Sequence, residues 1–132
     1  MNKKSRFLGK LINRNHNQNI EVNVDVVEYD ENDIFYVYCP AFDLIGYGKT
    51  QQEARESWEL VLEEYFKYAL NKKTLIRDLE ERGWSIRKKK DYIAPTFSWM
   101  LKNNEQLSEV YNNHDFHKTT RPITVPLHEA CA

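Results

Sequence analysis

Residues 35–68 constrain the fold of this chain most, because two strand-like runs there lead through a short turn into one long amphipathic stretch. The first run, residues 35–39, is aromatic and β-branched, and Pro40 ends it because proline cannot donate a hydrogen bond to a sheet. The second run, residues 44–49, contains Gly46 and Gly48, which predict either a β-bulge or the close approach of another backbone. Two neighbouring strands beside a helix are the expected arrangement.

The helix is predicted over residues 50–70. Thr50 precedes Glu53 by three residues, a spacing at which the two side chains cap the free amides of a helix start. Helical periodicity then separates an apolar face, which we expect to enter the core, from a charged face that we expect in solvent. The predicted core face comprises Ala54, Trp58, Val61, Leu62, Tyr65, Tyr68 and Ala69. The charged face comprises Glu56, Glu59, Glu63 and Lys67.

The segments on either side of this unit supply further strands. Residues 20–29 alternate between valine or isoleucine and polar residues, which predicts a strand with one buried face. The polar turn at residues 30–33 then joins it to an antiparallel mate at residues 34–39. After the long helix, a short second helix is expected to end at Gly83, and residues 84–87 are expected to form a fourth strand.

The order of these motifs resembles the HicB antitoxin family. The similarity lies in YVYCP at residues 36–40, GYGKT at 46–50, the helix start at 53–54 and LEERGW at 79–84, and it covers about residues 20–86. The resemblance implies a partial RNase-H-like α/β fold without nuclease activity. It also implies pairing with a small RNA-cleaving toxin of the HicA type, which the antitoxin silences, usually as a homo-oligomer.

The chain is expected to divide into three parts. Residues 1–19 form a basic arm, residues 20–92 the HicB-like domain and residues 93–132 a C-terminal extension. The arm has five cations and no acid, and its apolar residues follow helical spacing, so we weigh a frayed terminus against a short helix docked on the body or on a partner. The cations are Lys3, Lys4, Arg6, Lys10 and Arg14, and the apolar residues are Phe7, Leu8, Leu11 and Ile12.

In the extension, two short helical turns are expected around residues 97–111, separated near residues 103–104, although residues 97–101 also fit a strand. Residues 122–127 are flanked by prolines and predict an edge strand, of this sheet or of another subunit's. The fold class is therefore α+β: a small, mostly antiparallel sheet of three or four strands packed on one long helix, with a short second helix and this extension.

Bulk composition limits the function classes. At 132 residues one domain with appendages is expected, and a net charge of −1 gives no general attraction to nucleic acid or anionic membranes. No apolar run approaches the ~20 residues that cross a bilayer, and no secretory signal is visible, so a cytoplasmic location is expected. Cys39 and Cys131 do not form a disulfide framework.

The titratable residues do not predict an active site. A nuclease of the RNase H type needs several carboxylates converging on two metal ions, whereas the candidates here fall at strand ends, in turns or at the helix cap. These candidates are Asp25, Glu28, Asp30, Asp43 and Glu53. His114, His117 and His128 match no recognised metal-ligand spacing. We therefore expect a protein that is not an enzyme and that needs no metal or cofactor.

The expected activity is binding. Toxins of the HicA type are basic, so two acidic sets are the candidate toxin-binding residues: Glu56, Glu59 and Glu63 on the long helix, and Asp30, Glu31 and Asp33 at the hairpin tip. The basic cluster Arg87, Lys88, Lys89 and Lys90 is a candidate nucleic-acid contact. The alternative to an antitoxin is an orphan HicB-like regulatory or nucleic-acid-binding module that acts as a homodimer or larger homo-oligomer without a toxin.

Overall fold

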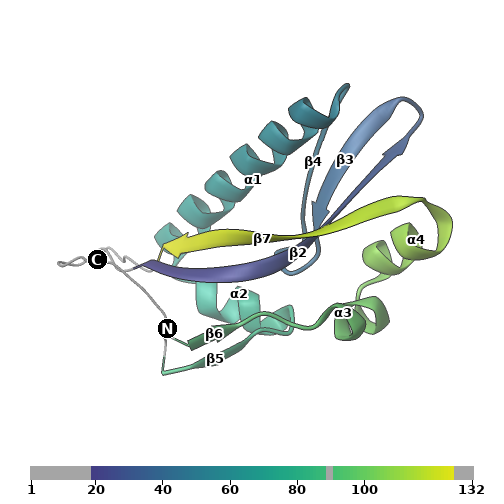
Figure 1. Cartoon of the computed structure of the whole chain (residues 1–132). Helices are drawn as coiled ribbons and strands as arrows, with labels where there is room; N and C mark the ends of the chain where they lie inside the picture. Colours follow the sequence, from purple (N-terminus) through teal and green to yellow (C-terminus); the bar gives the residue numbers. More distant parts are fainter. Residues whose placement is uncertain (1–18, 89–90, 127–132) are drawn as a thin grey trace.

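The computed structural model describes residues 19–88 and 91–126. Its main sheet is antiparallel and has the strand order β4-β3-β2-β7 (Figure 1). The strands are β2 (Asn19–Glu31), β3 (Ile34–Cys39), β4 (Leu44–Gly48) and β7 (Phe116–Pro126). The predicted α+β class is confirmed: this sheet packs on one long helix, α1 (Gln51–Lys72).

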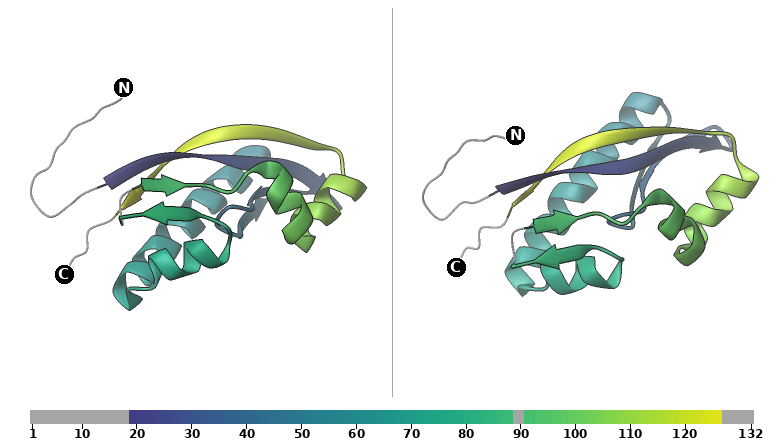
Figure 2. Two further views of the ribbon diagram at one scale, coloured as in Figure 1. Left: turned by 90° about the horizontal axis from the view of Figure 1, so that it is seen from below. Right: turned by 60° about the horizontal axis from the view of Figure 1, so that its bottom comes forward.

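The remaining elements join α1 to β7. Helix α2 (Leu75–Glu81) follows α1, and the short strands β5 (Ser85–Arg87) and β6 (Asp91–Ile93) form a separate hairpin. Helices α3 (Phe97–Asn103) and α4 (Glu105–Asn113) then lead into β7, and Figure 2 shows this whole series on the near side of the long strands. No helix in residues 19–88 and 91–126 is long and apolar enough to cross a membrane.

The predicted helix start is confirmed in atomic detail. The Thr50 hydroxyl accepts a hydrogen bond from the Glu53 amide at 3.0 Å, and the Glu53 carboxylate accepts one from the Lys49 amide at 3.0 Å. The predicted end at residue 70 was too early. The helix continues to Lys72 and ends at Lys73, whose left-handed backbone (φ 59°) returns its amide to the carbonyls of the last turn.

The predicted core face of α1 was wrong at two positions. Tyr68 is 61% exposed, whereas Phe66, which falls outside the predicted stripe, is 6% exposed. Phe66 packs edge-on against Phe42 from the turn between β3 and β4, with ring centroids 5.5 Å apart. The buried side of the helix therefore faces the β3–β4 turn. The periodicity of the helix sequence alone does not reveal this contact between Phe66 and Phe42.

Gly46 and Gly48 let α1 lie directly on β4. A Cβ atom at Gly46 would lie 2.2 Å from the Trp58 amide nitrogen, and one at Gly48 would lie 2.5 Å from the Glu53 Cβ. The pairing of β3 with β4 is continuous, so of the two predicted alternatives, bulge or close approach, the structure has the close approach.

The fourth strand of the main sheet comes from the C-terminal extension. Strand β7 pairs with β2 from Asn19 opposite Pro126 to Tyr29 opposite Phe116, so the predicted edge strand belongs to the chain's own sheet and is longer than expected. Residues 85–87 do form a strand, but the expectation that they would be the fourth one of the main sheet was wrong. They pair with β6, while Trp84 before them donates its indole hydrogen to the Ala41 carbonyl at 2.7 Å.

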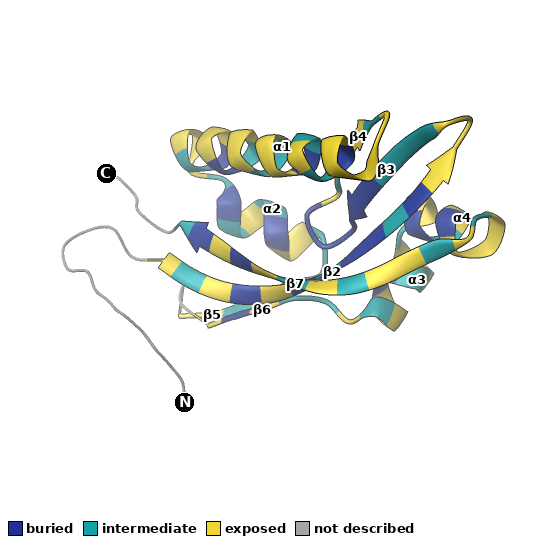
Figure 3. Cartoon of the chain, turned by 45° about the horizontal axis from the view of Figure 1, so that its top comes forward, coloured by how far each residue is buried: buried dark blue, intermediate teal, exposed yellow. Residues whose placement is uncertain are grey.

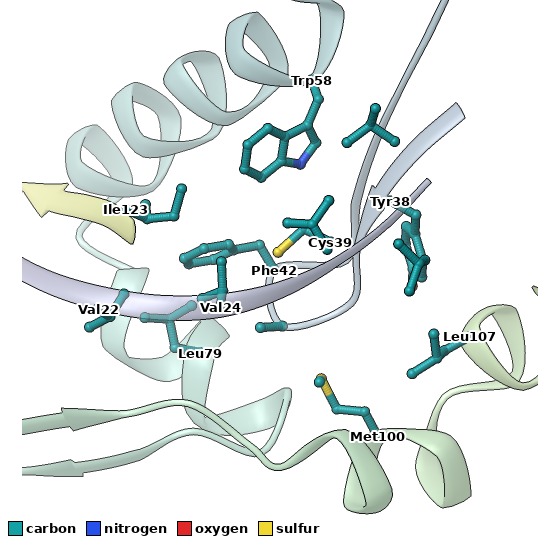
Figure 4. Packing of buried hydrophobic residues seen from close by; sticks show 14 of the residues in the cluster. Val22, Val24, Tyr38, Cys39, Phe42, Trp58, Leu79, Met100, Leu107 and Ile123 are labelled. Atoms are coloured by element: carbon teal, nitrogen blue, oxygen red, sulfur yellow. The ribbon is translucent and has the colours of Figure 1, made fainter. Parts of the chain in front are cut away.

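One continuous core joins the extension to the rest of the molecule. Figure 4 shows its buried side chains running from Trp58 on α1 past Phe42 to Met100 and Leu107 on α3 and α4. At the far end, the Tyr38 hydroxyl donates to Asp43 at 2.7 Å and accepts from the Asn104 amide group at 2.9 Å. The two helical turns predicted around residues 97–111 are confirmed, and they close this end of the core.

Candidate partner-binding groove

The acidic row of α1 lies in solvent, as predicted. Glu56, Glu59 and Glu63 are all exposed, and Figure 3 colours much of α1 as exposed. Gln52, one turn earlier, donates a hydrogen bond to the Glu56 carboxylate at 2.9 Å. Solvated rows of charge are common on protein surfaces, so this row indicates a binding site only if the surface beside it also suits a partner.

Beside the row lies a groove between α1 and the edge strand β7, with a volume of about 910 Å³. Glu56, Glu59 and Glu63 line it together with Lys67, so the acidic set predicted from the sequence shares one concave surface. Its apolar lining comes from both elements: Leu60, Leu62, Phe66 and Leu70 from α1, and Pro122, Ile123 and Pro126 from β7. Apolar area between carboxylates suits a protein partner better than a small charged ligand.

Leu60 is the most exposed leucine, isoleucine or phenylalanine of this groove. It is 63% exposed, although Trp58 two residues before it and Phe66 six residues after it are buried. Exposed leucine alone is ordinary on a protein surface. Here it lies among three carboxylates in a groove, which is the combination of apolar centre and polar rim found at protein interfaces.

The three carboxylates differ in how freely they can meet a partner. Arg121 of β7 lies 3.4 Å from the Glu59 carboxylate, and its guanidinium stacks over the Trp58 ring at 5.5 Å. Glu59 is therefore already engaged across the groove. Among the described residues, neither Glu56 nor Glu63 forms an ion pair, so these two are the carboxylates that an incoming cation would meet.

The second predicted acidic set lies elsewhere. Asn32 and Asp33 form the two-residue β2–β3 turn with positive φ angles of 54° and 66°, and Glu31 lies 3.8 Å from His114 at the end of α4. Asp30 lines a smaller pocket of about 250 Å³ that is not part of the groove. The structure therefore does not bring Asp30, Glu31 and Asp33 together with the row on α1.

That smaller pocket contains an internal ion pair. The Glu28 carboxylate, 10% exposed, accepts hydrogen bonds from Arg55 Nε at 3.1 Å and Nη2 at 3.0 Å. The same contact raises the pKa of the Arg55 guanidinium. A bidentate pair of this kind fixes β2 to α1 and leaves little capacity on Glu28 for another ligand.

Three of the other four nuclease candidates are likewise engaged, and the fourth, Asp30, lines the smaller pocket. Asp25 lies 3.6 Å from Lys118 and 3.4 Å from the Thr120 hydroxyl, Asp43 accepts from Tyr38, and Glu53 caps α1. In residues 19–88 and 91–126, no three His, Cys, Asp or Glu side chains converge as a metal site would require.

The histidines lie in different elements. His114 is the C-cap of α4, 3.6 Å from Glu109 and 5.0 Å from the Tyr29 ring centroid. His117 is exposed in β7 opposite Glu28. His128 lies outside the described residues.

The basic cluster falls partly outside the described residues as well. Arg87 ends β5, Lys88 begins the turn with φ 54°, and both are exposed; Lys89 and Lys90 are not described. Arg87 pairs with Asp91 across the hairpin, which places an acid beside the cluster.

The sequence indicated one wall of the groove and missed the other. Helix periodicity identified the carboxylates of α1. No pattern in the neighbouring sequence indicates that Arg121 and Ile123 lie opposite them, because β7 is positioned by pairing with β2, about 100 residues earlier. The proline-flanked alternation at residues 122–127 was the one available signal for that wall.

Comparisons with protein-family models, with curated proteins and with solved structures find no match to this chain.

Proposed function

We propose that this chain is an antitoxin-like binding protein that neutralises a small, basic, RNA-cleaving toxin of the HicA type by direct contact. The observation that carries the proposal is the α1–β7 groove, in which the acidic row predicted from the sequence lies beside exposed apolar surface. The family resemblance of residues 36–54 supplies the class of partner, and the groove supplies a surface that fits its charge.

The chemistry of the groove fits such a partner. A protein that binds RNA presents lysine and arginine to phosphates, and the same side chains can pair with carboxylates of an inhibitor. Glu56 and Glu63 offer these carboxylates, and Leu60 between them offers the apolar contact that supplies affinity at the centre of an interface. A partner held there would have its cationic surface covered and unable to bind RNA.

We propose a non-catalytic role for the chain itself. Of the carboxylates that a nuclease would require, Asp25, Glu28 and Asp43 already have partners within the sheet region. The proposed mechanism is therefore steric and electrostatic occlusion of the toxin.

The test has two stages. The tagged chain is first captured from its native cells, and a small basic protein is expected in stoichiometric amounts. Affinity for that protein is then measured for Glu56→Lys with Glu63→Lys. Interfacial charge pairs couple by about 1.5–7 kcal/mol, so we expect at least a ~10-fold loss.

The matched control is Glu64→Lys with Glu81→Lys. Both residues are exposed and outside the groove, and this pair of changes alters the net charge equally. Equal losses in the two variants would show that only net charge matters and would refute the assignment of the groove. Recovery of the chain alone as a stable oligomer would overturn the antitoxin proposal in favour of the orphan module.

A further inference from the structure

We propose that the chain's own N-terminal segment, residues 1–18, occupies the α1–β7 groove and competes there with any partner. The occupation of the groove is independent of the partner's identity, whereas its regulatory meaning rests on the proposed function. Three features of the described residues and the sequence support it: charge, apolar content and the position of Asn19.

Charge is complementary between segment and groove. The segment contains five cations and no carboxylate side chain. The groove presents Glu56 and Glu63, which have no ion pair among the described residues. The cation in its lining is Lys67, and Arg121 next to the lining pairs with Glu59. Oppositely charged surfaces on one chain attract without any search through solution.

The apolar residues of the segment match the rest of the groove. Phe7, Leu8, Leu11 and Ile12 follow helical spacing, so a helix over these residues would have one apolar face with Lys10 and Arg14 beside it. The groove offers Leu60, Leu62 and Ile123 to such a face. Burial of each large apolar side chain in the groove would stabilise the docked segment by about 1.5–3 kcal/mol relative to the same segment in solvent.

The chain connection makes the docking local. Asn19, the first residue of β2, itself lines the groove, and the starts of β2 and the ends of β7 and α1 lie at the same side of the molecule (Figure 1). Residues 15–18 can extend over about 14 Å at ~3.5 Å per residue, which lets the chain reverse and place Arg14 and Lys10 along α1. A short tether of this kind gives effective concentrations in the millimolar range, so even a weak contact would be populated.

A competing segment would set the threshold for partner binding. The apparent affinity of a partner falls in proportion to the fraction of molecules whose groove is open. A partner that binds tightly displaces the segment, whereas weak basic ligands are rejected.

Paramagnetic NMR on the full-length chain tests this directly. Ser5→Cys with Cys131→Ser carries a nitroxide at residue 5, because Cys39 is fully buried and does not react. We expect the label to broaden the backbone amides of α1 residues 56–67 and β7 residues 123–125 by at least twofold more than those of α4. Adding Glu56→Lys with Glu63→Lys should remove the broadening, whereas Glu64→Lys with Glu81→Lys should leave it.

Three results would overturn the proposal: no selective broadening of the groove, broadening that survives the Glu56 and Glu63 changes, or broadening only when labelled and isotope-enriched molecules are mixed. The last result would identify a second copy of the chain as the occupant. No toxin is present, so the outcome is separate from the capture experiment. If a basic protein is captured but residues 1–18 do not dock in the groove, the proposed function is retained and this inference is refuted. If residues 1–18 dock but no basic protein is captured, this inference is retained and the proposed function is refuted.

Discussion

Tyr38 and Cys39 are adjacent acids that the fold keeps protonated. Burial raises the pKa of the Cys39 thiol to about 12. Burial and the hydrogen bond donated to Asp43 raise the pKa of the Tyr38 phenol as well. Both groups are neutral in the folded and unfolded states below pH ~8, so neither makes stability depend on pH there.

Stability should therefore fall in alkaline solution. As pH rises above the unfolded thiol's pKa of ~8.5, the unfolded chain loses this proton while the folded chain keeps it, and the free energy of unfolding declines by up to ~1.4 kcal/mol per pH unit until about pH 12. Tyr38 adds to the decline above its unfolded pKa of ~10. Urea unfolding between pH 8 and 11 measures the slope.

Cys39→Ala is the control for that slope. The variant loses some stability at every pH because a small cavity remains. Between pH 9 and 10, however, its free energy of unfolding should decline less steeply, by up to ~1.4 kcal/mol per pH unit, which is the contribution of one proton. Identical slopes in the two proteins would mean that Cys39 does not keep its proton on folding.

At the scale of elements, the approach of α1 to β4 depends on Gly46. A methyl group there would meet backbone atoms of Trp58 at 2.2 and 2.5 Å, which cannot move without shifting the helix. We expect Gly46→Ala to lower the free energy of unfolding by about 1–3 kcal/mol or more, as overpacking does. Chemical denaturation measures the change.

Lys49→Ala, at an exposed position three residues later, should change stability by less than ~0.5 kcal/mol. Removing a glycine without steric conflict would stabilise the fold by about 0.4–1 kcal/mol, through a less flexible unfolded chain. A stabilised Gly46→Ala protein would thus contradict the close contact between helix and strand.

The elements that could be predicted are those whose signal is local. Alternation in residues 20–29, the Thr50 cap and the left-handed Gly83 (φ 99°) each depend on neighbours in sequence, and the structure has the strand, the helix start and the helix end that they predicted. Phe66 and Tyr68 were exchanged because the position of α1's buried side is set by Phe42, which lies outside the helix.

Strand β7 shows the same limit more clearly. Its first half, residues 116–121, is mostly polar and contains no buried residue, so no alternation marks it as a strand. It is held in the sheet by pairing with β2, about 90 to 100 residues away. The groove could therefore be predicted only in part. Its acidic wall follows from helix periodicity, whereas its β7 wall depends on a long-range pairing that the local sequence does not show.

At the scale of the whole molecule, that pairing joins the two ends of the described chain into one sheet. Helix α4 closes the core between them, with Leu107 fully buried and its N-cap Asn104 bonded to Tyr38 of β3. We therefore predict that residues 19–126 unfold as a single cooperative unit, including the segment that sequence reasoning treats as an extension from residue 93.

Leu107→Ala tests this unity by native-state hydrogen exchange. Truncation of a fully buried leucine costs about 2–5 kcal/mol, and in a single unit the slowest amides everywhere should lose protection by that same amount, Val24 in β2 and Trp58 in α1 included. Tyr68→Ala, at a largely exposed position outside the groove, should leave them unchanged. If protection fell only in residues 97–126, the extension would be a separate unit resting on the sheet. Equal loss at Val24 would instead mean that the groove's two walls, α1 and β7, form and disappear together.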